Sequence, residues 1–579
     1  MKHPDVGKQD SGESTTWGIR PFWLAGLLVA TAISLAGQTG RLATDLPNAG
    51  AAGKIQVVIQ YNSPPSEADL AQVAGASGKI KLRLPAIDGA VFELNANAVQ
   101  ALAHNPRIRF VSPDREVRGT LEFANPTVYA PIAALYGWNG TGVGVAVIDS
   151  GLNNHEDFKD SQCSKSRIAY KESFVPGDTG VNDAYGHGTH VAGIVAGNGK
   201  CAEKDGRVIT FRGIAPEAKI VSLRVLGATG SGTDSAVIAA IDRAIALKNQ
   251  YNIRVINLSI GRPVRESYTL DPLCQAVERA WQAGIVVVVA AGNGGRDNSR
   301  QTDGYATISS PGNDPFAITV GAMRDVGTPI RADDLIASYS SKGPTLLDHV
   351  VKPDLVAPGN AIISALAGSS SLVQNNPANI VSRNYYVIDA PNKPSPYYFK
   401  LNGTSMAAPM VSGAAALLLE KDPGLTPNQV KARLMKTASK VFPSISSYME
   451  LLTGIVYTTQ YDIFTVGAGY LDVWTALNNG DLVQTPSTTP LSPRVSYNPA
   501  TGKVSMVSST SVVWGDSVVW GESLVWGTQV FLSGTSVVWG DSVVWGDSLA
   551  TGFSVVWGDS VVWGDSVVWG DTILVNGDR

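Results

Sequence analysis

The chain has 579 residues, of which 44% are hydrophobic and 16% are charged, and its formal net charge is −4. A chain of this length contains about three or four structural units, and its hydrophobic content excludes disorder throughout. A negative chain also lacks the basic surface that nucleic-acid binding requires, so we expect no nucleic-acid partner.

An apolar segment lies near the N-terminus, over residues 22–36, after Arg20 and a stretch that contains both basic and acidic residues. It is shorter than the roughly 20 residues with which a helix spans a bilayer. Ser34 and Ala36 have the spacing of a signal-peptidase site, which predicts a signal peptide over residues 1–36. An uncleaved N-terminal anchor is the alternative. Both interpretations send the chain across a membrane, to a secreted, extracellular or cell-surface location.

Residues 54–118 have the pattern of a small α+β domain. β-branched or alternating runs predict strands over 55–61, 79–84, 90–94 and 108–113, and helices are expected over 66–76 and 98–104. The order strand, helix, strand, strand, helix, strand is that of a ferredoxin-like fold.

Residues 126–480 have a different pattern, in which apolar strands alternate with longer helices. Continuous apolar runs predict buried strands over 143–149, 220–226, 255–260, 285–290 and 316–320, with helices over 235–248 and 272–283. We therefore expect an α/β domain, with a mainly parallel sheet covered by helices on both faces. The following residues, 481–510, include a stretch rich in Pro, Ser and Thr that is typical of a linker.

The C-terminal segment, 511–579, is a hexapeptide array in which SVVWG recurs, usually followed by Asp. It holds eight of the 13 tryptophans and, with seven Asp, one Glu and one Arg, has a net charge of −7. An even period places every Trp on one side of an extended chain, so the tail is β-prone. A β-solenoid and a low-complexity tail that self-associates or binds the cell surface both fit this pattern.

The three cysteines have neither the paired spacing of a zinc site nor the density of a disulfide scaffold. If one bridge forms, we expect Cys163–Cys201, because both residues lie in polar, loop-like stretches. Cys274 would then be the free thiol.

Four local motifs in the α/β region contain residues suited to catalysis. Asp149 ends a strand in GVGVAVIDSG, His187 lies in GHGTHVAG, Asn293 follows a strand in IVVVVAAGN, and Ser405 precedes a long apolar helix in NGTSMAAPMVSG. A serine near a positive helix end needs a base to take its proton, and a histidine needs a carboxylate to orient it. An asparagine amide can donate a hydrogen bond to an oxyanion. We also expect Pro409 in the first turn of the helix, where its missing N–H is tolerated.

In that order, these motifs resemble those of the subtilisin-like serine peptidases, the subtilase family. VINLSIG at 255–261, SSKGP at 340–344 and KPDLVAPG at 352–359 add to the resemblance, which covers roughly 129–477. It implies that Asp149 is the orienting acid, His187 the general base and acid, Ser405 the nucleophile and Asn293 the oxyanion donor.

The resemblance also implies where a substrate binds. One edge strand would pair with the substrate backbone, and two further segments would line the pocket for the residue before the scissile bond. The edge strand is Gly230, Ser231 and Gly232, and the pocket segments are Ser259, Ile260 and Gly261 with Ala290, Ala291 and Gly292. These pocket segments contain no acidic cluster, which favours apolar or broad specificity.

Two alternatives remain for single residues. Asp149 could be only a strand-end cap, and His190 could be the functional ring, although a structural hydrogen bond suits His190 better. No HExxH or paired Cys/His spacing supports zinc hydrolysis. The chemistry requires no cofactor, no metal ligand can be assigned, and structural calcium is an expectation that rests on acidic loops at 178–183 and 297–303.

By the same resemblance, residues 54–118 occupy the position of an inhibitory propeptide, which predicts a self-processing zymogen cut within 118–125. A stable N-terminal domain that is never removed is the alternative. Residues 364–400 precede the nucleophile motif and contain five aromatic residues, so this segment either rims the cleft or covers the surface. The predicted activity is that of a secreted endopeptidase acting on protein and peptide substrates. A surface adhesion or assembly protein with an inactive peptidase fold is the competing hypothesis.

Overall fold

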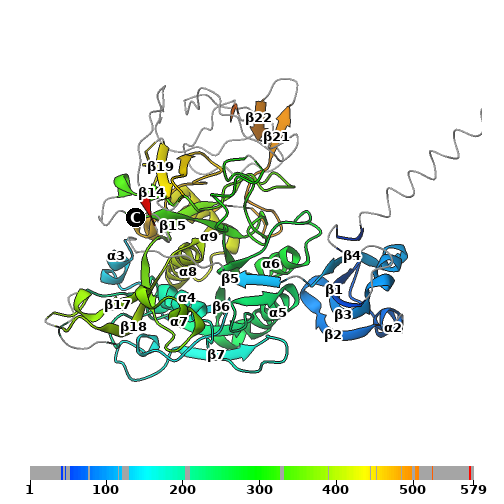
Figure 1. Cartoon of the computed structure of the whole chain (residues 1–579), viewed down its shortest axis with the longest axis horizontal. Helices are drawn as coiled ribbons and strands as arrows, with labels where there is room; N and C mark the ends of the chain where they lie inside the picture. The colour runs from blue at the N-terminus through cyan, green and yellow to red at the C-terminus, as the bar shows by residue number, and fades with distance from the viewer. Residues whose placement is uncertain are drawn as a thin grey trace, which may run out of the picture.

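The computed structural model describes residues 41–43, 46, 53–75, 78–114, 116–119, 129–202, 206, 209–300, 302–325, 331–388, 390–443, 445–450, 453–483, 485–498, 503–506, 524–525 and 573–574. A small domain, blue in Figure 1, lies beside a much larger one. The predicted signal peptide and nearly all of the hexapeptide array lie outside the described residues. None of the helices in the described ranges has the length and hydropathy needed to cross a membrane.

The small domain is a four-stranded antiparallel sheet in the order β2-β3-β1-β4. Its elements follow the predicted sequence, except that the second helix is a 3₁₀ helix: β1 (Lys54–Tyr61), α2 (Glu67–Gly75), β2 (Lys79–Leu84), β3 (Gly89–Asn95), η3 (Ala96–His104) and β4 (Ile108–Pro113). This strand order, with every neighbour antiparallel, is the ferredoxin-like topology. The domain has its own buried core, which includes Val57, Ile59, Phe92 and Phe110.

The large domain is built on an eight-stranded, mostly parallel sheet in the order β14-β13-β12-β10-β6-β8-β7, with β15 also paired to β13. Only β14 runs antiparallel within it. The strands are β6 (Gly144–Asp149), β7 (Ile168–Ser173), β8 (Lys219–Arg224), β10 (Ile253–Leu258), β12 (Val286–Ala290), β13 (Ile318–Arg324), β14 (Leu335–Ile336) and β15 (Leu355–Pro358). Each predicted strand of this domain is present, because continuous apolar runs form strands that are covered on both faces.

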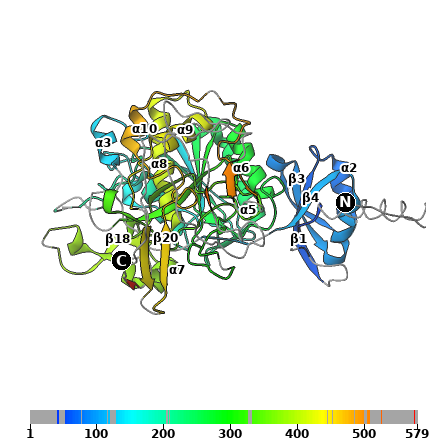
Figure 2. The same cartoon turned by 90° about the horizontal axis from the view of Figure 1, so that it is seen from above.

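Helices cover both faces of this sheet (Figure 2). On one face lie α4 (His187–Ala196) and α8 (Thr404–Lys421), which contact each other and the central strands. On the other face lie α5 (Asp234–Tyr251) and α6 (Pro272–Gln282), which also contact the small domain. The last long helix, α9 (Pro427–Thr437), begins with a capping box in which Thr426 and Gln429 exchange hydrogen bonds.

A disulfide joins Cys163 to Cys201, as the sequence predicted, and Cys274 is a buried free thiol. The bridge closes a loop across 38 residues. The aromatic-rich segment at residues 364–400 is covered by β16 (Ile362–Ala365), α7 (Ser371–Asn375), β17 (Ile380–Ser382) and β18 (Pro394–Leu401). Tyr386 and Tyr398 are buried in it and meet edge to face with ring centroids 5.1 Å apart.

The last part of the chain before the array packs on the large domain. Ser492 is buried and donates a hydrogen bond to the carbonyl of Pro315, while Val351 N donates to Pro493 O. Hairpin β19 (Ile445–Glu450) and β20 (Val456–Gln460) pairs with β24 (Ile573–Leu574), and β21 (Val495–Asn498) pairs with β22 (Lys503–Met506). Packing therefore extends into residues 485–498, where the composition is typical of a linker.

Candidate active site

Asp149 and His187 come together at the carboxyl end of the parallel sheet. Asp149 is the last residue of β6, the strand next to the middle of the sheet, and His187 is the first residue of α4. His187 Nδ1 lies 2.8 Å from Asp149 Oδ1, and both side chains are almost completely buried. Asp149 Oδ1 also accepts the N–H of Ser150 at 2.7 Å. The carboxylate therefore fixes the orientation of the imidazole ring.

A second carboxylate, Asp183, holds the start of α4 in place. It accepts hydrogen bonds from Ser150 Oγ at 2.7 Å, Gly186 N at 2.6 Å and Thr189 N at 2.8 Å. Burial raises the pKa of Asp183, while these hydrogen bonds oppose that rise. Because Ser150 also accepts from Gly188 N, the loop after β6 and the first turn of α4 form one network. From the sequence, Asp183 was expected only as an oxygen ligand in an acidic loop, and no local pattern indicated this role.

His190 faces away from Asp149. Its Nε2 lies 3.1 Å from the carbonyl oxygens of both Ile362 and Phe399, and burial lowers its pKa to about 3. A neutral ring that donates to backbone carbonyls is a structural group, as the sequence predicted. His187, rather than His190, is the ring that pairs with a carboxylate.

Ser405 is the second residue of α8, so it lies at the positive end of a buried helix. Pro409 stands one turn further into the helix than predicted, because α8 already begins at Thr404. At that position Pro409 removes the N–H that would bond the carbonyl of Ser405. Ser259 Oγ donates to that carbonyl instead, at 2.7 Å, and Ser405 Oγ lies 3.2 Å from Ser259 O. The proline therefore couples the start of α8 to the segment around Ser259.

Asn293 approaches the same helix start from the loop after β12 (Val286–Ala290). Its Oδ1 accepts hydrogen bonds from Thr404 N at 3.0 Å and from Thr404 Oγ1 at 3.1 Å. With the amide oxygen fixed in this way, Nδ2 is the end of the side chain that can donate to a ligand. Asn293 is thus hydrogen-bonded to the residue that precedes Ser405.

The segments predicted to bind a substrate backbone form a three-stranded sheet with β5 (Glu116–Gly119) in the middle. β5 pairs antiparallel with β9 (Ser231–Thr233) and with β11 (Ile260–Gly261). The predicted edge strand was displaced by one residue, since β9 contains Thr233 and not Gly230. Gly230 has a φ of +77°, and a Cβ there would lie 2.2 Å from the ring of Tyr185, so it is a turn residue.

The two predicted pocket segments meet at Ser309. A Cβ at Gly261 would lie 2.5 Å from Ser309 Oγ, and a Cβ at Gly292 would lie 3.0 Å from the same atom. Ser309 N also donates to the carbonyl of Ala291. Glycine is therefore required on both segments so that their backbones can approach this side chain.

The acidic loops that suggested calcium have protein partners. Asp178 pairs with Arg224 at 2.7 Å, Asp183 has the three donors described above, and Asp297 accepts Ser299 N at 2.8 Å. Among the described residues, no group of three or more His, Cys, Asp or Glu side chains is arranged to hold a metal ion. Structural calcium at these loops stays a prediction.

Comparison with known proteins places this geometry in a family. The model of the subtilase family matches residues 140–460. Serine protease AprX of Bacillus subtilis (strain 168) is 36% identical over 405 residues, which cover 67% of this chain and 83% of AprX. Subtilisin E of the same organism is 33% identical over 372 residues, covering 63% of this chain and 80% of subtilisin E.

Among solved structures, fervidolysin from Fervidobacterium pennivorans, a keratinolytic enzyme related to subtilisin, has a TM-score of 0.55 and 23% identity. The match covers 77% of this chain and 63% of that chain, which is less than two thirds of its length, and concerns the fold. All four motifs lie within the matched residues 140–460. The chain therefore belongs to the subtilase family and is a subtilisin-like serine endopeptidase.

Proposed function

We propose that the chain is the zymogen of a secreted endopeptidase, in which residues 54–118 form an inhibitory propeptide. The observation that carries this proposal is β5, which follows the small domain and forms the middle strand between β9 and β11. A substrate backbone bound by strand addition would occupy the same position. The segment that connects the small domain to the large one thus occupies the cleft as an inhibitor.

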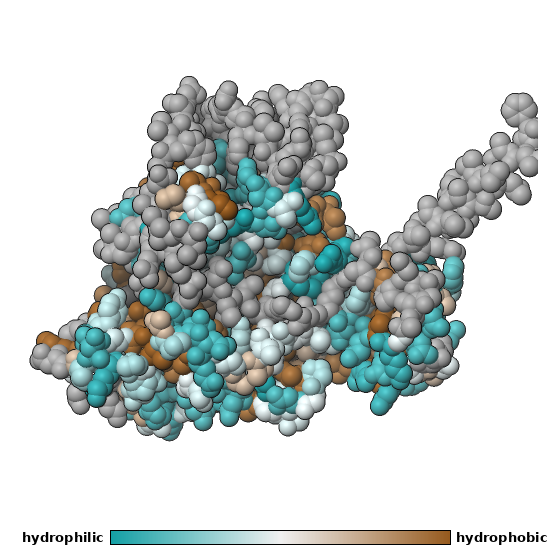
Figure 3. Space-filling model, viewed as in Figure 1, coloured by the Kyte–Doolittle hydropathy of each residue, from teal (hydrophilic) through white to brown (hydrophobic). Residues whose placement is uncertain are grey.

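Contacts between the two domains support this interpretation. Arg109 donates to the carbonyl of Thr269 at 3.1 Å, and Gln60 of the small domain hydrogen-bonds to Gln275 of α6. Asp114 accepts Ser235 N at 2.7 Å and also accepts Ser235 Oγ. Figure 3 shows hydrophilic residues over much of the outer surface of the small domain. The polar contacts to the large domain thus come from Gln60 of β1, from Arg109 of β4 and from Asp114, which directly follows β4.

The proposed reaction is acyl transfer without a cofactor. Ser405 Oγ attacks the carbonyl carbon as His187 takes its proton, and Asp149 stabilises the charged ring. The N–H of Ser405 and the amide of Asn293 donate to the oxyanion. The C–N bond then breaks as His187 protonates the leaving amine, and water releases the acyl group by the same steps.

The register of β5 suggests which bond is processed. Gly119 is opposite Ile260 and Arg118 is opposite Gly261, so β5 runs toward Ser259 at its C-terminal end. Ser259 O lies 3.2 Å from the hydroxyl of the proposed nucleophile. We therefore propose cleavage between Thr120 and Leu121, within the predicted region 118–125.

The proposed substrates are proteins and peptides, and the enzyme is proposed to prefer an apolar residue before the scissile bond or to accept many residue types there. The hexapeptide array is proposed to attach the enzyme to the cell surface or to other copies of itself, without a part in catalysis. Deletion of residues 511–579 is then expected to leave peptide turnover unchanged and to alter attachment or secretion. Loss of turnover in a folded deletion variant would contradict this division of the chain.

The zymogen proposal is tested by expressing the wild-type chain and the Ser405→Ala variant. The wild type is expected to yield a mature form that begins at Leu121, hydrolyses casein and reacts with a serine-directed fluorophosphonate. The variant is expected to keep its propeptide covalently attached and to show none of these activities. An active wild-type enzyme whose N-terminus lies before Lys54 would refute processing, and unchanged casein hydrolysis in the variant would refute the assignment of Ser405.

A further inference from the structure

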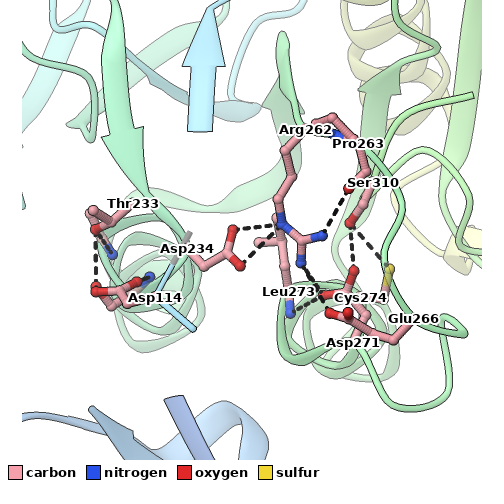
Figure 4. Close-up of polar contacts among 12 residues, drawn as sticks. Asp114, Thr233, Asp234, Arg262, Pro263, Glu266, Asp271, Leu273, Cys274 and Ser310 are labelled. Atoms are coloured by element: carbon pink, nitrogen blue, oxygen red, sulfur yellow. Dashed lines mark hydrogen bonds and ion pairs between the residues drawn. The ribbon is translucent and has the colours of Figure 1, made fainter. Parts of the chain in front are cut away.

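A buried arginine, Arg262, follows directly after β11, one of the two strands that flank β5. Its side chain is only 2% exposed. Nε donates to Asp234 at 2.9 Å and 3.1 Å from the two carboxylate oxygens, and one terminal nitrogen donates to Asp271 at 2.7 Å (Figure 4). The carboxylate of Glu266 lies 3.6 Å from the same terminal nitrogen. One guanidinium group therefore joins three carboxylates that come from different segments.

Both hydrogen-bonded partners are held rigidly by secondary structure. Asp234 is the first residue of α5 and follows immediately after β9. Asp271 caps α6 by accepting Leu273 N at 2.9 Å, and its other oxygen accepts Ser310 Oγ at 2.7 Å. The backbone of Arg262 is also fixed, because it exchanges two hydrogen bonds with Ser310, at 2.9 Å and 2.8 Å.

The pair Arg262–Asp234 connects the residues that follow the two outer strands. β9 and β11 are both antiparallel to β5, so they run parallel to each other and both end on the same side. Two strands with one strand between them lie roughly 9–10 Å apart. A planar guanidinium that donates to a carboxylate in a fixed geometry sets that separation more strictly than two loops would.

Arg262 stays charged in this environment. Burial alone would lower its pKa, but the carboxylates of Asp234, Asp271 and Glu266 raise it. A lysine at this position would keep the charge, but a single ammonium group cannot reproduce the fork that reaches both Asp234 and Asp271.

We propose that Arg262 is a positioning residue, which fixes the gap between β9 and β11 so that an extended substrate backbone can enter as the middle strand. This inference rests on the proposed function, in which substrates take the place of β5. It concerns substrates long enough to pair with both strands. A short ester that occupies only the position next to Ser405 does not depend on this gap.

The test compares two substrates on mature enzyme obtained from the full chain: a peptide anilide with four residues before the scissile bond and an ester with a single acyl residue. Arg262→Lys and Asp234→Asn are expected to raise KM for the four-residue substrate about tenfold, because small displacements of a binding strand weaken alignment strongly. For the ester, kcat/KM is expected to change less than about twofold, since its chemistry does not use this pairing.

A matched control is Arg167→Lys. Arg167 is also buried, and its guanidinium donates to the backbone carbonyls of Asp157, Ala196 and Ala218 at 2.6–2.9 Å. None of these three residues belongs to β9 or β11. This control is expected to lower the melting temperature while the ratio of the two kcat/KM values stays as in the wild type. If Arg262→Lys does not mature, Asp234→Asn decides the question, because it keeps the Arg262–Asp271 contact.

An unchanged ratio in a folded Arg262→Lys or Asp234→Asn enzyme that still reacts with a fluorophosphonate would overturn the role of Arg262. Failure of the wild-type enzyme to hydrolyse either substrate would instead refute the proposed function. The two failures are therefore distinguishable in one experiment.

Discussion

The contact between the proposed propeptide and α5 predicts that the proposed inhibition weakens as the pH rises. Asp114 accepts two hydrogen bonds from Ser235, yet burial, together with the nearby charge of Asp234, raises its pKa to about 6. A carboxyl group released into water has a pKa near 3.9. The bound form therefore takes up more protons than the free form between these two values.

The sign and size of the effect follow from this difference. Below about pH 4 the carboxyl is protonated in both states, and binding is strongest. As the pH rises from about 4 to 6, the free carboxyl ionises while the bound one stays protonated, so each pH unit between the two pKa values weakens binding about tenfold. Above about pH 6 both forms are ionised and the effect of Asp114 levels off. Asp114 alone then weakens propeptide binding by about 100-fold between pH 4 and pH 8. Asp242, whose pKa burial raises to about 7 beside the N–H of Ala86, acts in the same direction.

The assay is the inhibition constant of the released propeptide, residues 54–120, against mature enzyme at pH 5, 6, 7 and 8. Asp114→Asn is expected to flatten the pH dependence below about pH 6, because the amide can still accept Ser235 N but cannot ionise, and the part due to Asp242 remains. Glu67→Gln is the matched control, since Glu67 forms an exposed ion pair with Arg83 within the small domain. An inhibition constant that varies less than about twofold over this range, or the same slope in Asp114→Asn, would refute the reasoning.

Three further predictions concern the large domain. Asp149→Asn is expected to lower kcat about 10⁴-fold with a small change in KM, because the ring of His187 loses its orienting charge; steady-state kinetics measures both values. Cys163→Ser is expected to destabilise the fold by about 3–4 kcal/mol, measured by denaturant unfolding, and an equal stability of the reduced wild type and the oxidised wild type would contradict this. The pH profile of kcat/KM is expected to show the ionisation of one imidazole, that of His187, since His190, with its pKa lowered to about 3, stays neutral. A second imidazole ionisation that disappears in His190→Asn would contradict this.

The strands of both domains could be predicted because the signal for them is local. Runs such as 285–290 are apolar without interruption, and the burial of every residue of β12 follows from that pattern. Asp149 and His187 also have local signals: Asp149 directly ends a buried strand, and His187 lies among glycines and other small residues. The resemblance implied that these two residues pair, and His187 Nδ1 lies 2.8 Å from Asp149 Oδ1.

Errors arose where a position depends on exactly where an element starts. Pro409 was expected in the first turn of its helix, but α8 starts at Thr404, so the proline exposes the carbonyl of Ser405 to Ser259. Gly230 was assigned to the edge strand, although the ring of Tyr185 confines it to a turn. Neither displacement alters the hydrophobic pattern, which is why the pattern could not detect it.

Networks between distant segments gave no sequence signal at all. Arg262 is separated by 28 residues from Asp234 and by nine from Asp271, and an isolated arginine is ordinarily a surface residue. The only local hint was position: Arg262 directly follows one segment that was predicted to bind substrate, and Asp234 lies two residues after the other. Charged residues at the ends of substrate-binding strands are therefore worth testing as possible cross-links before the fold is known.

The difference between inhibitor and substrate cannot lie in the strand pairing, because β5 makes the contacts that any extended peptide could make. It lies in the folded domain attached to that strand, which adds the contacts of Gln60, Arg109 and Asp114 to α5, α6 and the loop between them. After the chain is cut, these contacts hold the strand in the cleft only while the small domain stays folded. A domain of about 60 residues with a single small core is marginally stable on its own. We therefore expect substitutions in that core, such as Phe92→Ala, to speed the release of activity without changing kcat of the mature enzyme. An unchanged activation rate in such a variant would show that inhibition does not depend on the folding of the small domain.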